Sequence, residues 1–254
     1  MKDFKQHFYS MFEKFKKSEN FAFTRFSDGE LRILQNVGLE LAPGHNVING
    51  IKTKGRYAPE NLKSFVPERD QFYKDKLFES CRFKKKNYYA GLCCRCCVGD
   101  KQHQQMLDWY EGDVTSEFLT WSNLLLNSNY PLFMENFLPE FKKKKIVLIC
   151  NKNCNIEKLP FKVVQDFRVG PYCMRNDYDL IETVKTWIKD NDINDHVFLF
   201  SAASLSNFMI HQLFDFNDKN TYIDIGSTLN NILGIDNKRG YLRGGRTTKK
   251  TCVW

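Results

Sequence analysis

The 254-residue chain has no long apolar run and no break in composition. No stretch approaches the roughly 18 consecutive apolar residues of a membrane-spanning helix. The start, MKDFKQHFYSMFEKFKK, also lacks the uninterrupted apolar segment of a signal peptide. There is no low-complexity linker and no internal repeat. We therefore expect a cytoplasmic protein without a membrane span, folded as a single domain over residues 1–254.

The sequence also lacks the interleaved basic and aromatic residues of a known nucleic-acid-binding module. Its formal net charge of +8 comes partly from lysine runs at 84–86 and 142–145. Each run precedes an apolar segment that predicts a strand, and such runs are typical of solvated loop ends. We expect no nucleic-acid partner, whereas small anionic ligands are compatible with the charge.

Nine cysteines are present, several of them inside apolar segments such as KIVLIC, which ends at Cys150. Cysteine in such a segment acts as a small apolar residue, which indicates a reducing compartment rather than a disulfide framework. The segment Cys93-Cys94-Arg95-Cys96-Cys97 contains two overlapping Cys-x-x-Cys pairs. The nearest further ligands, Cys81 and His103, form no known zinc pattern. We expect a strand of small residues here, an incomplete ligand set and no stoichiometric zinc.

Apolar periodicity predicts an α/β fold with a mainly parallel, Rossmann-like sheet, helices on both faces and a helical insertion. The first 20 residues predict an amphipathic helix with a phenylalanine stripe, packed on the domain rather than lying on a membrane surface. Strands and helices then alternate from residue 145 to the segment TYIDIG. FAFTRF and NYYAGLCC predict earlier strands, and the intervals 27–86 and 101–141 are expected to be mostly helical or irregular.

Polar side chains follow several of these predicted strands directly. They are Asp28 and Glu30, Asn151 and Asn153, Ser201 and Ser204, and Gly226 and Ser227. Because ligands bind outside the carboxyl ends of strands in an open parallel sheet, we expect these residues to meet at one cleft.

The segment Ser27-Asp28-Gly29-Glu30 has two interpretations. Ser27 and Glu30 fit a capping box at a helix start. Asp28 and Glu30, at a turn from strand to helix, also offer hard oxygen ligands for Mg²⁺ or Mn²⁺, and Gly29 lets a phosphate approach the backbone. Spacing alone does not separate these two interpretations.

The segment FTRFSDGEL resembles the Arg-Phe-Gly-Asp-Gly-Glu signature of the GT-D-fold glycosyltransferases, a family of nucleotide-sugar enzymes. Later segments resemble that family in the same order, so that the resemblance covers residues 21 to about 235: WSNLLLNSNYPLF, KIVLICN, FLFSAASLSNFMIHQL and YIDIGSTLN. Two positions depart from the pattern, because Ser27 and Ala203 stand where the family usually has glycine.

The resemblance implies metal-dependent transfer with inversion at the anomeric carbon. A hexosyl or pentosyl group would move from a nucleoside diphosphate sugar, expected to be UDP-linked, to a hydroxyl of a glycan or glycosylated acceptor. It implies that Asp28 and Glu30 serve Mn²⁺ or Mg²⁺ and the diphosphate, with Arg25 as a phosphate or carboxylate partner. Glu30 and Asp177 are candidates for the general base. The alternatives are a non-catalytic nucleotide or sugar-phosphate binding domain and, third, a methyltransferase that depends on S-adenosylmethionine (SAM).

Three further features bear on the ligand. Ser201 and Ser204 precede a predicted helix, where they would cap it or bind phosphate. Asp224, at the end of a strand, fits a methyltransferase ribose ligand poorly, because it lies near the chain end without a glycine-rich loop; it would orient backbone or a substrate hydroxyl. The basic tail 238–254 would either be solvated or cover a diphosphate through Arg243 or Arg246, and His211 is expected to be exposed rather than catalytic.

Overall fold

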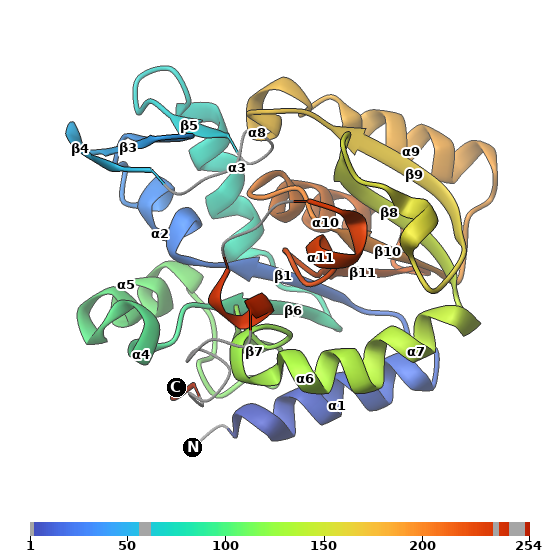
Figure 1. The fold of residues 1–254 in the computed structure, drawn as a ribbon. Helices are drawn as coiled ribbons and strands as arrows, with labels where there is room; N and C mark the ends of the chain where they lie inside the picture. The colour runs from blue at the N-terminus through green and yellow to red at the C-terminus, as the bar shows by residue number, and fades with distance from the viewer. Residues whose placement is uncertain (1–2, 56–61, 236–238, 244–251) are drawn as a thin grey trace.

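The computed structural model describes residues 3–55, 62–235, 239–243 and 252–254. Its central feature is a seven-stranded sheet in which every pair of neighbouring strands is parallel (Figure 1). In sheet order the strands are β7 (Leu119–Trp121), β6 (Tyr88–Leu92), β1 (Ala22–Phe26), β11 (Thr221–Asp224), β10 (His196–Phe200), β8 (Lys145–Asn151) and β9 (Val163–Val169). The central strands are apolar and buried on both faces, which confirms the predicted α/β class.

Helices cover both faces of this sheet and enclose two apolar cores (Figure 1). Beside the core that contains Leu77, Val184 and Leu213 lie α2 (Asp28–Leu34), α3 (Gln71–Arg82), α5 (Asp100–Tyr110), α9 (Leu180–Asp190) and α10 (Leu205–Phe216). The other core lies beneath α1 (Phe4–Lys16) and a run of short helical segments that includes α6 (Tyr130–Leu132) and α7 (Leu138–Glu140). Three further short helices are α4 (Arg95–Val98), α8 (Cys173–Asn176) and α11 (Asn230–Leu233).

The N-terminal helix packs on the domain, as predicted. The apolar stripe of α1 is buried, and Phe8 meets Phe137 edge to face with ring centroids 5.5 Å apart. A helix whose phenylalanines are used in this way has no apolar face left for a membrane surface. Within the described residues, none of the helices combines the length and the apolar character needed to cross a bilayer.

The interval between β1 and β6 contains a small antiparallel sheet. Its strands, in the order β4 (Ile51–Lys54), β3 (His45–Ile48), β2 (Leu39–Ala42) and β5 (Lys63–Phe65), stand over α2. The expectation of mostly helical or irregular structure is therefore wrong for residues 39–54 and 63–65, although α3 follows them. The missed signal is Asn49-Gly50, whose positive φ angles of 49° and 78° form the two-residue turn of a β-hairpin.

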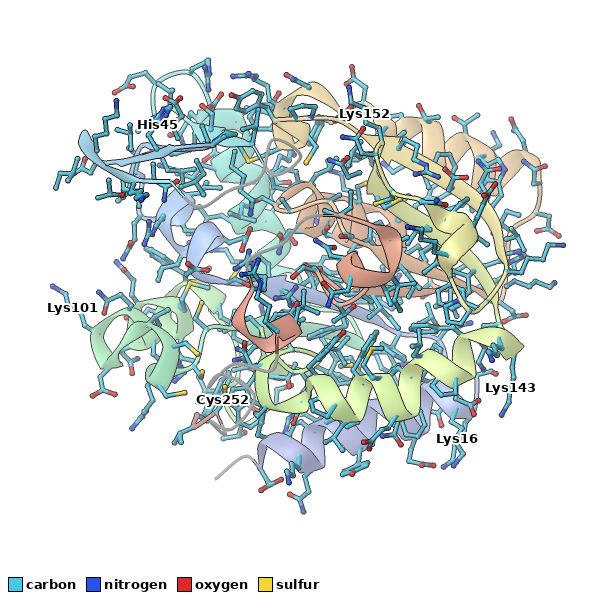
Figure 2. All side chains as sticks on the ribbon, viewed as in Figure 1. Lys16, His45, Lys101, Lys143, Lys152 and Cys252 are labelled. Atoms are coloured by element: carbon cyan, nitrogen blue, oxygen red, sulfur yellow. The ribbon has the colours of Figure 1, made fainter. Side chains whose placement is uncertain are left out.

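The lysine run before β8 lies on the outside of the molecule, as expected for a loop end. Lys143 is exposed, and Figure 2 shows it at the periphery together with Lys16, Lys101 and Lys152. The lysine run lies at the amino end of β8, opposite to the carboxyl edge of the sheet, so the cations that face a ligand come from elsewhere in the chain.

Candidate functional site

A cleft of about 660 Å³ lies at the carboxyl ends of β1, β6, β7, β10 and β11. Because the strands are parallel, residues that follow different strands meet at this edge. Six of the seven residues predicted for the site line the cleft: Arg25, Asp28, Gly29, Glu30, Ser201 and Asp224. The seventh, Ser204, does not line it but is bonded to Glu30. Asn151 and Asn153 do not line it; Asn151 Oδ1 accepts from the amide of Asn153 in a local turn after β8.

Glu30 closes the capping box that the sequence predicts. Its Oε2 accepts a hydrogen bond of 3.0 Å from the amide of Ser27, the residue before α2. Its Oε1 accepts one of 2.7 Å from the hydroxyl of Ser204. The side chain is only 5% exposed, so Glu30 joins the start of α2 to the loop before α10.

Asp28 differs from Glu30 although both belong to α2. It is exposed to the cleft and makes no hydrogen bond or ion pair with any residue that the structure describes. Both carboxylates line the cleft from the first turn of α2. The structure thus places a carboxylate that is fixed by two hydrogen bonds and an open one two positions apart in the sequence at this edge.

Arg25 and Asp224 form a buried ion pair on the cleft wall. Arg25 Nη1 lies 3.4 Å from Asp224 Oδ1, and its Nε donates to the carbonyl of Ser122. Asp224 Oδ1 also accepts from the amide of Gly226 at 2.8 Å. Burial raises the pKa of Asp224 to about 6, although the charge of Arg25 opposes this shift.

Gly226 has a positive φ of 52°, and a Cβ built on it would lie 2.1 Å from Arg25 Nη1. Glycine is therefore required here both by the backbone and by the guanidinium. Ala203 also has a positive φ, 49°, which is unfavourable for alanine. This is one of the two positions at which the sequence departs from the glycine of the GT-D-type pattern.

The cleft is also lined by four cationic residues that were not predicted from the sequence. They are Arg32 on α2, Lys54 on β4, Lys63 on β5, and Arg239. A Cβ built on Gly29 would lie 3.9 Å from Lys63 Nζ, so that ammonium group stands over the Asp28-Gly29 turn. Lys54 and Lys63 reach the cleft because the small sheet stands over α2. No local motif marks them, since their positions depend on how that sheet packs.

The cleft has two parts that differ in their contacts. We call Arg25, Glu30, Ser204 and Asp224 the cleft floor; these four are buried and bonded to their neighbours. We call Asp28, Lys54, Lys63 and Arg239 the cleft rim; Lys63 is half-buried and the other three are exposed. The floor is suited to holding its own shape, and the rim is suited to contacting a ligand.

Two other candidate residues lie outside the cleft. Asp177 Oδ2 accepts from the amide of Gly170 at 2.9 Å, and Asp177 does not line the cavity. His211 is half-buried rather than exposed, because its ring packs on Phe83 with centroids 4.5 Å apart. Burial lowers the pKa of His211, but the ring does not reach the cleft.

The basic tail is packed in the parts that the structure describes. Tyr241 is buried, lines the cleft and shares a 2.6 Å hydrogen bond with the hydroxyl of Ser227. Of the two arginines predicted to cover a diphosphate, Arg243 does not line the cavity and Arg246 lies outside the described residues. Among the described residues of the tail, Arg239 is the arginine that lines it.

The cysteine segment departs from its predicted structure. Strand β6 ends at Leu92, and Cys96 and Cys97 lie in the short helix α4. Cys94, Cys96, Cys97 and Cys252 have sulfur atoms within 4.8 Å of one another, so the expectation of an incomplete ligand set is wrong. Cys81 and His103 are not part of this group; His103 Nδ1 is instead bonded to the carbonyl of Cys93.

Comparison with solved structures supports the fold. The chain resembles a structure described as "The highly conserved domain of unknown function 1792 has a distinct glycosyltransferase fold", with a TM-score of 0.53 and 11% identity over 87% of this chain and 77% of that one. A selenomethionine-substituted structure of domain of unknown function 1792 gives a TM-score of 0.52, with the same identity and coverage. No protein-family model and no curated protein sequence matches the chain. The protein therefore has a glycosyltransferase-like fold.

Proposed function

We propose that the cleft binds a nucleoside diphosphate sugar and that the protein is a metal-dependent glycosyltransferase of the GT-D type. The observation that supports this most is the rim, where the open carboxylate of Asp28 and the ammonium of Lys63, which stands over Gly29, both line the cleft at the carboxyl edge of a parallel sheet. The glycosyltransferase-like fold is consistent with it. We take a UDP-linked hexose or pentose as the donor and a hydroxyl of a glycan or glycosylated acceptor as the acceptor.

The carboxylates fit a divalent metal ion. Mg²⁺ and Mn²⁺ bind through one or two protein carboxylates together with substrate phosphates and water. Both oxygens of Asp28 are open, and each oxygen of Glu30 accepts one hydrogen bond, which leaves a further lone pair on each. Asp28 and Glu30 would hold the ion, whose charge would offset the charge of the departing diphosphate.

The remaining residues would bind and orient the donor. Lys54, Lys63 and Arg239 are placed to pair with phosphate oxygens. The Arg25–Asp224 ion pair holds the cleft floor behind them in place. In the transfer, the acceptor oxygen forms a bond to the anomeric carbon while the bond from that carbon to the diphosphate oxygen breaks. The acceptor proton leaves to a base; Asp177 is too remote for this role, and Glu30 is already bonded to Ser27 and Ser204.

The geometry makes the methyltransferase alternative weaker. A cofactor ribose needs a carboxylate that accepts from its hydroxyls, whereas Asp224 is 5% exposed and is bonded to Arg25 and to the amide of Gly226. Strand β1 leads into Ser27-Asp28-Gly29-Glu30 rather than into a glycine-rich loop.

The test is slow donor hydrolysis by the purified protein with a panel of nucleotide sugars and Mn²⁺. We expect one donor to release its nucleoside diphosphate, and we expect chelator or Asp28→Asn to stop the release. Asp190→Asn, which changes an exposed aspartate of α9 outside the cleft, is the matched control and should retain full activity. Donor binding without turnover would favour the non-catalytic binding domain. Hydrolysis unchanged in Asp28→Asn would contradict the proposal.

A further inference from the structure

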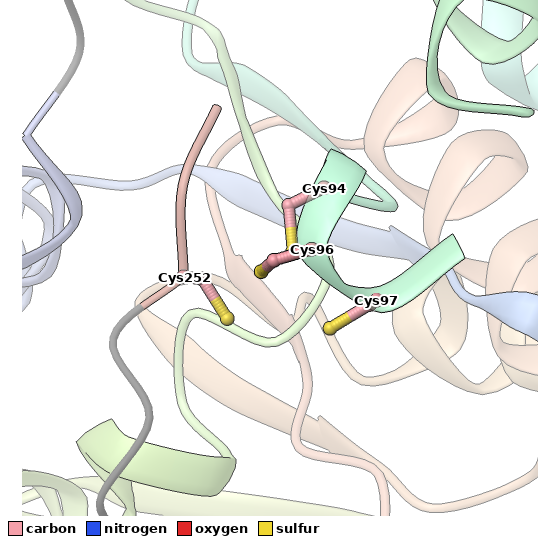
Figure 3. Close-up of side chains that lie close together, drawn as sticks. All are labelled: Cys94, Cys96, Cys97 and Cys252. Atoms are coloured by element: carbon pink, nitrogen blue, oxygen red, sulfur yellow. The ribbon is translucent and has the colours of Figure 1, made fainter. Parts of the chain in front are cut away.

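Four cysteines from two distant parts of the chain meet beside the cleft. Cys94, Cys96 and Cys97 lie at and in α4, and Cys252 is the third residue from the end of the chain (Figure 3). All four sulfur atoms lie within 4.8 Å of one another. We propose that these four thiols form a structural zinc site that fastens the C-terminus to α4.

The sulfur spacing fits one tetrahedral ion. Zinc–sulfur bonds of about 2.3 Å place the sulfur atoms of a four-cysteine site about 3.8 Å apart. The upper limit of 4.8 Å in this cluster, with 3.2 Å between Cys94 and Cys96, brackets that value. Sulfur atoms this close surround a single ion and leave no room for a multi-iron cluster.

The local backbone brings the first three thiols together. The amide of Cys97 donates to the carbonyl of Cys94 at 3.0 Å, which closes the Cys-x-x-Cys turn and directs both side chains to one side. The expected strand would instead have placed neighbouring side chains on opposite faces. The turn is therefore the feature that converts a row of cysteines into a ligand group.

The fourth ligand is held in place by its neighbours. Trp254 packs edge to face on Trp121 and on His103, with ring centroids 5.1 Å apart in each pair. Asn123 Nδ2 donates to Cys252 Sγ at 2.7 Å and approaches Cys97 Sγ at 3.7 Å. Hydrogen bonds from outer residues to metal ligands are typical of protein metal sites.

The type of ligand in the cluster indicates which metal it binds, and the number of ligands indicates whether the site is structural or catalytic. Four thiolates with no carboxylate or histidine select a soft ion such as zinc rather than Mg²⁺ or Mn²⁺. Four protein ligands leave no open position, so the site is structural rather than catalytic. Cys94 and Cys252 are buried, whereas Cys97 is exposed and gives an ion a path of entry.

The proposed zinc site is independent of the proposed glycosyltransferase activity. The nine cysteines form no disulfide in the structure, so all four thiols of the cluster are available to a metal. Because Cys97 and Asn123 also line the cleft, the zinc would fix the chain end next to the ligand site. Its loss should loosen Trp254 from Trp121.

The experiment measures metal content in protein purified under reducing conditions and dialysed against metal-free buffer. We expect one zinc per chain and, after exchange for Co²⁺, the visible absorption of a tetrahedral thiolate site. Cys252→Ser should bind zinc at least about tenfold more weakly. Cys154→Ser, which removes a buried thiol outside the cluster, is the matched control and should retain the ion.

Because Cys252→Ser could impair folding, Cys97→Ser provides a second variant at an exposed position. The Co²⁺ spectrum of the unmodified protein needs no variant at all. Metal-free wild-type protein, stoichiometric iron in place of zinc, or zinc retained at full affinity in both serine variants would overturn the proposal. So would a disulfide among the four cysteines, found by intact mass before and after reduction, in protein that holds no metal.

Discussion

The floor and the rim of the cleft belong to one cavity but are held in different ways. On the floor, Glu30 joins Ser27 to Ser204, and Asp224 joins Arg25 to Gly226. On the rim, Asp28 has no bonded partner among the described residues, and Lys54 and Lys63 come from a small sheet added over α2. Buried, satisfied polar groups stabilise a fold, whereas exposed groups are available to a ligand.

This difference makes the two parts separable by mutation. Changes on the rim should reduce ligand binding and turnover without changing the free energy of unfolding. Changes on the floor should lower that free energy. A rim variant that unfolds the protein, or a floor variant without any effect on stability, would contradict this division between ligand-binding rim and stabilising floor.

The largest effect is expected for Asp28→Asn. The amide removes a charged oxygen ligand from an exposed site while preserving size, so donor turnover should fall by more than about 100-fold, beyond the range typical of residues that only support a metal ligand. The melting temperature should stay within about 1 °C, since Asp28 is exposed and its side chain is bonded to none of the residues that the structure describes. Steady-state donor hydrolysis and thermal unfolding of the same samples check both expectations.

Glu30 should respond differently to two substitutions. Glu30→Ala leaves the amide of Ser27 and the hydroxyl of Ser204 without their partner and should cost about 3 kcal/mol of unfolding free energy in urea. In Glu30→Gln the amide oxygen can accept from the backbone of Ser27 and the amide nitrogen can donate to the hydroxyl of Ser204, so the substitution should cost less than about 1 kcal/mol. Turnover should fall because the charge is lost. A fully active Glu30→Gln enzyme would assign Glu30 to the floor alone.

Asp224 predicts a pH dependence of stability. Its pKa is about 6 in the folded protein, above the ordinary value of 3.8 for an aspartate, so the folded state binds the proton more tightly than the unfolded state. The stabilisation from protonated Asp224 is complete below the unfolded pKa and is lost as pH rises through 6. Between pH 4.5 and 7.5 the wild type should lose about 2 kcal/mol more than Asp224→Asn, measured by urea unfolding at each pH. An equal loss in both proteins would refute this role.

The smallest effect is expected at the edge of the rim. Arg239→Ala should raise the donor Michaelis constant roughly three- to tenfold, because one exposed charge-assisted contact to phosphate is removed. Arg243→Ala, four positions further along the tail, is the control, since Arg243 does not line the cleft. Equal Michaelis constants in the two variants would show that Arg239 does not contact the donor.

The sequence predicted the floor better than the rim, for physical reasons. Floor residues lie at or shortly after the carboxyl ends of β1, β10 and β11, and a parallel sheet brings such positions together. Lys54 and Lys63 lie on strands of four and three residues, and β4 is exposed throughout, so no apolar alternation marks it. Asn49-Gly50 is the sequence signal from which that small sheet could have been predicted. Local spacing could not have predicted that Cys252 lies beside Cys94, because the two cysteines are far apart in the sequence.

The central claim is that Asp28, on the rim, binds the diphosphate end of a nucleotide sugar together with a divalent metal ion. Calorimetric titration of UDP into the protein, with and without Mn²⁺, tests it most directly. We predict that Mn²⁺ strengthens UDP binding at least about tenfold in the wild type and in Asp190→Asn, and that this gain is absent in Asp28→Asn. UDP affinity that is independent of Mn²⁺, or a gain that persists in Asp28→Asn, would contradict the account.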